Sequence, residues 1–208
     1  RLIYDDVSDM LENNNEEQIN KYFDAYPMLT DASELYHILS RRRKRDGSLD
    51  FDLPESQIIL NDDGEPIDVI LSERRVANRL IEEFMLAANK TVAEHYFWAK
   101  NPLAYRVHEK PDALKMMELK EFLVNLGFSL NGKSDSTKTK ELSNILSMLD
   151  GKPEESLVSR VMIRTMQKAY YSAECLGHYG LAFKYYCHFT SPIRRYADLL
   201  VLRTIKNL

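Results

Sequence analysis

Two adjacent arginines near the end of the chain, Arg194 and Arg195, follow the pair Ser191 and Pro192. Ser191 is a favourable helix N-cap and Pro192 suits the first helical position, so the pattern predicts that a helix begins here. That end of a helix carries the positive end of the macrodipole, which disfavours each cation by about 0.3–1 kcal/mol. A bound anion would offset this repulsion, because a phosphate would meet backbone N–H groups and two guanidinium groups together.

An acidic residue follows within the same predicted helix. Asp198 lies three residues after Arg195 and four after Arg194, so it can hold one of them in position. Such a group also forms without any ligand, because many arginine–carboxylate networks have no functional role. On the residues alone, an anion site and an internal ion-pair network remain equally good interpretations.

The residues before and within this motif are rich in aromatic side chains. Flat rings beside a phosphate site can stack on the bases of a single-stranded nucleic acid, at about 1–3 kcal/mol per base. Most of these rings should pack in the core, with one or two at most facing a ligand. His188 lies among them, and we expect it to be a hydrogen-bonded structural residue rather than a proton shuttle. The rings are Tyr179, Phe183, Tyr185, Tyr186, Phe189 and Tyr196.

The bulk composition is that of an ordinary globular domain. The 208 residues are 44% hydrophobic and carry a net charge of −4, so any nucleic-acid site must be a local concentration of positive charge. No apolar run approaches the roughly 20 residues of a membrane span, and residues 1–15 do not form a signal peptide. Cys175 and Cys187 lack metal-ligand spacing, which favours a cytoplasmic protein. Both ends of the sequence look cut, so we expect a piece of a longer protein.

Helical periodicity dominates, and proline and glycine number only seven each. We expect Leu35, Ile38 and Leu39 to face inward from a helix that Gly47 ends. The polar stretch 131–140 is expected to be a surface loop. The fold class is therefore expected to be α+β with helix predominant. Expected helices cover residues 4–13, 16–25, 30–45, 74–100, 111–128, 141–149 and 154–171; a β-hairpin covers 56–71, and residues 103–108 and 179–189 are expected to be extended.

Two charged groups admit a simple and a functional interpretation. The run RRRKR at 41–45 sits at a predicted helix C-terminus, where the dipole favours cations. A solvated charge run is the simpler interpretation, and contact with a phosphate backbone is the alternative. Asp62 and Asp63 could suggest a metal pair, but the following Gly64 marks a turn, which explains them more simply.

The segment GHYGLAFKYYCHFTSPIRRYADLL (177–200) resembles the signature segment of the ribonuclease R/ribonuclease II family of hydrolytic 3′-to-5′ exoribonucleases, with the ribonuclease R branch the closer one. Further segments resemble the family in the same order: RLIYDDVSDMLEN, LDFDLPE (49–55), RRVANRLIEEFMLAANKTVAEH (74–95) and YRVHEKPD (105–112). The sequence departs from the family pattern at Ala197, where proline is usual, and at Leu202, where a histidine precedes the arginine.

The resemblance implies that residues 1–208 are the C-terminal portion of one exoribonuclease catalytic domain. It places the metal-binding aspartate segment upstream and the flanking OB-fold domains outside this sequence. It also implies processive hydrolysis of single-stranded RNA to nucleoside monophosphates with two Mg²⁺-type ions, and the ribose 2′-OH would distinguish RNA from DNA. We therefore expect no metal ligand or cofactor in this segment, no hydrolysis by it alone, and neither DNA nor a membrane as partner.

The resemblance also assigns site residues. Arg194 corresponds to the phosphate-contacting arginine, which would stabilise charge on the scissile phosphate. The alternatives are a non-catalytic RNA-binding module of the same fold, and a purely structural helical domain. The oligomeric state is not indicated. RNA contacts are expected from Arg106, His108, His188, Thr190, Ser191, Arg195, Tyr196 and Arg203.

Overall fold

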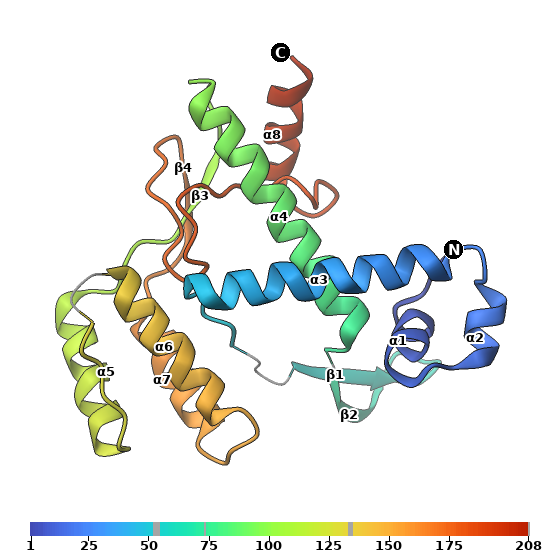
Figure 1. Cartoon of the computed structure of the whole chain (residues 1–208), viewed down its shortest axis with the longest axis horizontal. Coiled ribbons are helices and arrows are strands. Elements are labelled where there is room, and N and C mark those ends of the chain that lie inside the picture. The colour runs from blue at the N-terminus through green and yellow to red at the C-terminus, as the bar shows by residue number, and fades with distance from the viewer. Residues whose placement is uncertain (52–54, 73, 133–134, 208) are drawn as a thin grey trace. The chain divides into compact units, whose positions relative to one another are not determined.

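The computed structural model describes residues 1–51, 55–72, 74–132 and 135–207, and it is a helix-rich α+β chain, as the sequence predicts (Figure 1). It divides into two compact units: unit 1 comprises residues 1–38 and 52–83, and unit 2 comprises residues 39–51 and 84–208. The helices are α1 (Tyr4–Asn13), α2 (Glu16–Lys21), α3 (Tyr26–Asp46), α4 (Val76–Trp98), α5 (Ala113–Asn125), α6 (Asp135–Leu149), α7 (Glu155–Thr165) and α8 (Tyr196–Lys206). The strands are β1 (Glu55–Leu60), β2 (Pro66–Ser72), β3 (Tyr105–Val107) and β4 (Tyr170–Ser172).

Unit 1 packs α1 against the first turns of α3 and α4. Met10 of α1 is completely buried, and it clusters with Leu29 of α3 and Ala77 of α4. Arg75, just before α4, donates to the carboxylates of Asp9 (2.6 Å) and Glu12 (3.0 Å) in α1. Apolar burial and these ion pairs thus fix the start of α4 within the unit.

The predicted β-hairpin is confirmed in unit 1. Strands β1 and β2 pair antiparallel, and the side chain of Asn61 accepts hydrogen bonds from the backbone N–H groups of Asp63 (3.1 Å) and Glu65 (2.8 Å). Gly64 adopts a φ of 81°, which favours glycine. Asp62 and Asp63 therefore belong to a turn, which confirms the simpler of their two interpretations.

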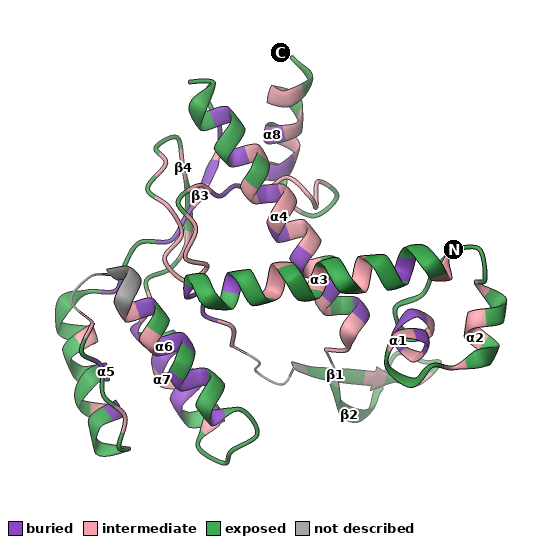
Figure 2. Cartoon of the chain, in the orientation of Figure 1, coloured by how far each residue is buried: buried purple, intermediate pink, exposed green. Residues whose placement is uncertain are grey.

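Helices α5, α6 and α7 of unit 2 share one core. Leu119 and Leu123 of α5 pack with Leu142 of α6 and Met162 of α7 in one core. Figure 2 shows the buried residues concentrated along α6 and α7, whereas α5 is largely exposed. Asp112 caps α5 by accepting from the backbone N–H of Leu114 at 2.9 Å.

A small strand ladder completes unit 2. Strand β3 pairs antiparallel with β4 along one edge, and Tyr105 of β3 forms an isolated bridge with Cys187. Successive side chains of a strand point to opposite faces. Tyr105, Val107 and Cys187 are buried in a core with α4 and Val201 of α8. The opposite face is left for Arg106 and its neighbours.

Several expected elements differ from the structure. Helix α3 begins at Tyr26 with Pro27 in its first turn, where a missing N–H costs nothing, and Leu35 and Ile38 are about half exposed rather than inward-facing. Helix α6 begins at Asp135, inside the stretch expected to be a loop.

The C-terminal half brings two further corrections. Residues 170 and 171, expected to end a helix, lie in β4, because pairing with β3 more than 60 residues earlier decides their conformation. Residues 179–189 form isolated bridges and bends rather than a continuous strand. In both cases a contact distant in sequence determines the local structure.

Candidate nucleic-acid interface

The start of α8 differs from the sequence prediction. The helix begins at Tyr196, Arg195 occupies its N-cap position, and no side chain makes a capping hydrogen bond there. The carbonyl oxygen of Ser191 accepts from the backbone N–H groups of Arg194 (3.3 Å) and Arg195 (3.2 Å) in a preceding turn. The prediction that Ser191 caps a helix containing both arginines is therefore wrong. These two N–H groups bond inside the turn and are not available to a phosphate.

A buried carboxylate explains this arrangement. Asp198 is completely buried, and its Oδ2 accepts from the backbone N–H of Ser191 and from the Arg195 guanidinium, both at 2.8 Å. One carboxylate thus joins the turn to the first turn of the helix, where the dipole favours a negative charge. The expectation that Asp198 holds one arginine is confirmed for Arg195.

Arg194 stands outside this network. It is exposed, and within the residues that the structure describes its guanidinium makes no hydrogen bond or ion pair. Its neighbour Ile193 is fully exposed at the tip of the turn, and the ring of Tyr196 is 66% exposed. The two interpretations of the motif therefore divide between the arginines: Arg195 belongs to an internal network, and Arg194 remains accessible to a ligand.

The face of the β3 ladder opposite the core carries a second group of predicted residues. The guanidinium of Arg106 lies over the ring of Tyr171, 4.8 Å from its centroid. The hydroxyl of Tyr171 is 3.0 Å from Nδ1 of His188. Three side chains from separate parts of the chain thus form one layer, and each fixes the orientation of the next.

Electrostatics connect this layer to the turn before α8. Burial, together with the charges of Arg195, Arg106 and Arg194, lowers the pKa of His188 to about 4 against the opposing effect of Asp198. His188 is therefore neutral at pH 7 and suits hydrogen bonding rather than charge pairing. We call Arg106, Tyr171, His188 and Arg194 the arginine–histidine site.

A line of rings extends from this site to His108. The ring centroid of Tyr186 lies 5.5 Å from that of His188 and 5.2 Å from that of His178, which in turn lies 4.9 Å from His108. Burial lowers the pKa of His178 to about 3 and also lowers that of His108, whose Nδ1 accepts from the backbone N–H of Gly180 at 3.0 Å. These rings are thus neutral at pH 7 and firmly positioned.

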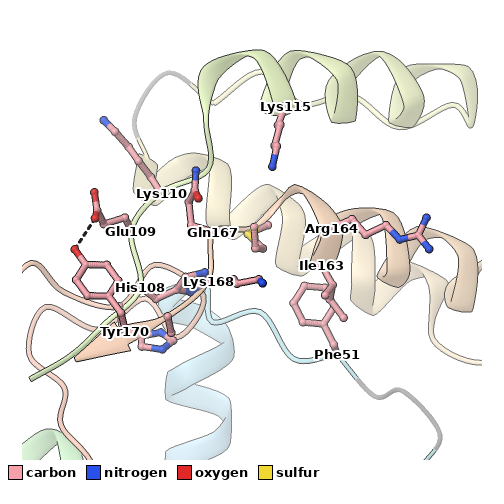
Figure 3. A pocket seen from close by; sticks show the side chains of 13 residues that line it. Phe51, His108, Glu109, Lys110, Lys115, Ile163, Arg164, Gln167, Lys168 and Tyr170 are labelled. Atoms are coloured by element: carbon pink, nitrogen blue, oxygen red, sulfur yellow. Dashed lines mark hydrogen bonds between the residues drawn. The ribbon is translucent and has the colours of Figure 1, made fainter. Parts of the chain in front are cut away.

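His108 and His178 also line a pocket of about 1030 Å³ (Figure 3). Figure 3 shows Lys115 reaching from α5 towards the space bordered by Phe51 and Ile163. Glu109, which also lines the pocket, accepts a hydrogen bond through its carboxylate from the hydroxyl of Tyr170 at 2.5 Å. A flat ring and several cations therefore line one cavity. The basic residues are Lys110, Lys115, Arg164 and Lys168.

The remaining predicted residues are more scattered. Arg203 is exposed in the last turn of α8, about 10 Å along the helix from Tyr196 at 1.5 Å per residue. The hydroxyl of Thr190 is buried and has no hydrogen-bond partner among the described residues. Ser191 contributes through its backbone, as described above. The structure thus groups Arg106, Arg194 and Arg195 around His188, whereas Arg203 lies further along α8.

The described residues do not offer a divalent-metal site. Among them, no group of three or more histidine, cysteine or acidic side chains could hold a metal ion. Asp6, one of the acidic residues near the N-terminus, pairs instead with Lys21 at 2.9 Å. In the same described part of the chain, no helix is long and apolar enough to span a membrane.

Comparisons with known proteins agree on one family. The family model described as the RNB domain matches residues 1–208. Ribonuclease R 1 of Lactococcus lactis subsp. lactis (strain IL1403) is 40% identical over 208 residues, covering 100% of this chain and 25% of that protein. Ribonuclease R of Aquifex aeolicus (strain VF5) is 48% identical over 173 residues, covering 83% of this chain and 24% of that protein.

A solved structure agrees as well. Mycoplasma genitalium RNase R in complex with ribose methylated single-stranded RNA matches with a TM-score of 0.84 and 29% identity, covering 97% of this chain and 31% of that one. The chain spans about a quarter of the length of the curated relatives it matches. Its relatives are therefore considerably longer proteins that contain a region like this one.

Proposed function

We propose, from the premise that this chain belongs to the RNB domain family, that it forms part of an exoribonuclease. The enzyme hydrolyses single-stranded RNA processively from the 3′ end and releases nucleoside monophosphates. Residues 1–208 are the C-terminal portion of its catalytic domain. Family membership confirms the resemblance carried by residues 177–200, and the relatives named ribonuclease R support the reaction class.

The observation that carries the proposal is the separation of the two arginines. Asp198 binds Arg195, whereas Arg194 stays exposed, and its charge helps to lower the pKa of His188 in the layer of Arg106, Tyr171 and His188. A guanidinium held near the reacting phosphate stabilises the negative charge that develops in the transition state. Arg194 therefore contacts the scissile phosphate, and its neighbours position the adjoining nucleotide.

The pocket of Figure 3 supplies further RNA contacts. Its lining combines the ring of Phe51 with the cations Lys115 and Lys168, so one wall suits a base and another suits a phosphate (Figure 3). Its volume of about 1030 Å³ suffices for a nucleotide. The neutral rings of His108 and His178 add hydrogen-bonding groups without adding charge.

The metal ions of the reaction, which we propose to be Mg²⁺, would be held outside the residues described here. The described donor groups do not fit a divalent-metal site, so no step is assigned to a metal on this chain. The partner is single-stranded RNA, and we propose neither DNA nor a membrane as partner. A cytoplasmic location fits this substrate.

The test uses the full-length protein and a 5′-labelled oligouridylate with Mg²⁺. We expect a ladder that shortens from the 3′ end, together with released nucleoside monophosphates. The 208-residue chain by itself should release none under the same conditions. Internal cleavage, or shortening from the 5′ end, would contradict the proposed reaction. Release of nucleotides by the chain alone would contradict the assignment of the metal ligands to another segment.

The second candidate is a non-catalytic RNA-binding module of the same fold. It keeps the exposed Arg194 and the cations of the pocket as RNA contacts and gives them no part in cleavage. In that case the full-length protein would bind oligouridylate with a strong salt dependence but would leave it intact with Mg²⁺ or Mn²⁺. The cleavage assay above therefore separates the two candidates.

A further inference from the structure

A second concentration of positive charge lies at the end of α3, away from the motif of residues 191–195 in the sequence. We infer that it is an additional contact surface for the sugar–phosphate backbone of RNA. The inference rests on the proposed function only for the identity of the polyanion. We call this surface the basic cluster; it comprises Arg41, Arg42, Lys44 and Arg45 of α3 and Lys140 of α6.

One arginine of the run has a structural role, and it fixes the orientation of the others. Arg43 is buried, with its guanidinium donating to the hydroxyl of Ser48 at 2.9 Å and to the carboxylate of Asp50 at 3.3 Å. Its carbonyl oxygen also accepts from the backbone N–H of Ser48 at 3.1 Å. Arg43 thus anchors the last turn of α3 to the chain that follows.

Helix geometry places the other cations on the outside. At 3.6 residues per turn, successive side chains are about 100° apart, so the remaining four spread over roughly 160° of the helix surface opposite Arg43. All four are exposed, and the side chain of Arg45 is 77% accessible. The buried arginine therefore requires its four basic neighbours to face solvent together.

The start of α6 adds a cation from a distant part of the sequence. Gly47 follows α3 with a φ of 93°, and a Cβ built on it would lie 2.8 Å from Cγ of Lys140. The hydroxyl of Ser143 in α6 donates to the carbonyl oxygen of Ser48 at 3.0 Å. These contacts hold the first turns of α6 against the end of α3, and the exposed Lys140 joins the cluster.

Stabilisation of the helix end does not account for so much charge. The C-terminal end of a helix carries about half a negative charge, so one cation already compensates it. Here four exposed cations lie within five consecutive residues at the end of α3, and Arg45 lies 3.9 Å from Asp46. The whole chain has 28 basic and 32 acidic residues, so the cluster opposes the average charge of the protein. An external polyanion therefore fits the surface best.

The sugar–phosphate backbone fits this surface better than an acidic protein segment does. The cations lie on the exposed surface of a helix end, which suits a strand that presents one charge per nucleotide. Three of the four on α3 are arginines, which stay charged at any physiological pH. The cluster should thus contribute to affinity without reading the base sequence.

The test compares two variants of the 208-residue chain with equal net charge. The first is Arg41→Gln, Arg42→Gln, Lys44→Gln and Arg45→Gln together. The matched control neutralises four exposed cations elsewhere in unit 2. Binding of a labelled 20-nucleotide oligouridylate is followed by anisotropy between 50 and 200 mM salt, with a duplex of the same length as a second arm. The control changes are Lys100→Gln, Lys120→Gln, Lys152→Gln and Arg160→Gln.

We expect the cluster variant to bind about tenfold more weakly at 100 mM salt. The slope of log affinity against log salt should become shallower by about 0.7 per lost phosphate contact on a single strand. The control should stay within about threefold of the unmodified chain. The duplex arm decides whether single-stranded or paired RNA gains more from the cluster.

Each outcome has a definite meaning. Equal affinities of cluster variant and control overturn the inference and leave the proposed function intact. Failure of the full-length protein to release nucleotides overturns the proposed function, whereas the binding comparison still tests the cluster. If the unmodified chain binds no oligouridylate at 50 mM salt, the inference is overturned as well.

A second variant guards against loss of folding. Arg41→Lys, Arg42→Lys and Arg45→Lys together keep the charge of the run and the interaction with the helix dipole. We expect this variant to bind RNA within about threefold of the unmodified chain, because the contact is mainly electrostatic. Thermal unfolding of all variants shows whether the glutamine variant is folded, and single changes Lys44→Glu and Arg45→Glu replace it if it is not.

Discussion

Two arginine-rich segments of unit 2 share one design and differ in what it leaves exposed. In the turn before α8, Asp198 binds Arg195 and leaves Arg194 accessible. At the end of α3, Ser48 and Asp50 bind Arg43 and leave four cations accessible. In each segment a paired arginine orients its neighbours.

The difference lies in the surroundings of the exposed charge. The charge of Arg194 helps to lower the pKa of His188, and His188, Tyr171 and Arg106 hold one another in a defined arrangement. The cations of the basic cluster spread over the exposed surface of one helix end. Defined position serves chemistry at one phosphate, whereas dispersed charge serves affinity for many phosphates.

The largest effect is expected from removing the carboxylate that binds Arg195 in the first segment. Asp198→Ala removes a completely buried carboxylate and leaves Arg195 and the N–H of Ser191 without their acceptor. We expect the free energy of unfolding of the chain to fall by about 3–5 kcal/mol in urea titrations. The control Asp50→Ala removes the one-third-exposed partner of Arg43 and should cost about 1 kcal/mol or less. Equal losses would contradict the claim that the buried carboxylate contributes more to stability than the partly exposed one.

The next effect is the pH dependence of stability, which is expected from the buried histidines near the first segment. Unfolded histidines titrate near pH 6.5, whereas the pKa values of His188 and His178 are about 4 and about 3 in the fold. Between these values the unfolded state binds protons that the folded state does not. Stability is therefore fully present above pH 6.5 and falls as the pH drops towards 4.

Urea unfolding of the chain at pH 7, 6, 5 and 4.5 measures this loss. The variant His178→Gln, His188→Gln should lose clearly less stability over the same range. An identical decline in both proteins would argue against buried neutral histidines. The basic cluster contains only arginine and lysine and keeps its charge throughout, so acid should affect the first segment alone.

The smallest effect concerns the shape of the cation. In the basic cluster, Arg42→Lys should change the affinity for oligouridylate less than threefold, because charge alone matters there. In the full-length protein, Arg194→Lys should restore turnover only in part relative to Arg194→Ala, because the bidentate fork is lost. Full restoration of turnover by lysine would remove the distinction between the two segments.

Local signals in the sequence predict much of the fold. Helix α1 has the predicted bounds, the hairpin turn follows from Asn61 and Gly64, and Gly47 ends α3. The start of α8 could not be predicted locally. The favourable pair Ser191 and Pro192 is overruled by a buried carboxylate seven residues further along.

The site shows the same division. Arg106 and His188 were predicted from the sequence and its family resemblance, and the structure places them on one face. Tyr171, which connects them, was missed because its stretch was expected to be helical. The cations of the pocket come from two stretches of chain about 50 residues apart, 110–115 and 164–168, so no sequence spacing joins them.

The role of Arg194 is tested most directly by single-turnover cleavage and RNA binding of the full-length protein. For Arg194→Ala we expect the cleavage rate constant to fall about 100-fold or more, as for other groups that stabilise transition-state charge, with the dissociation constant for RNA changed less than about threefold. Arg160→Ala, an exposed arginine on α7, controls for the loss of one charge and should alter neither quantity. An unchanged cleavage rate with weakened RNA binding would contradict the assignment of Arg194 to the scissile phosphate.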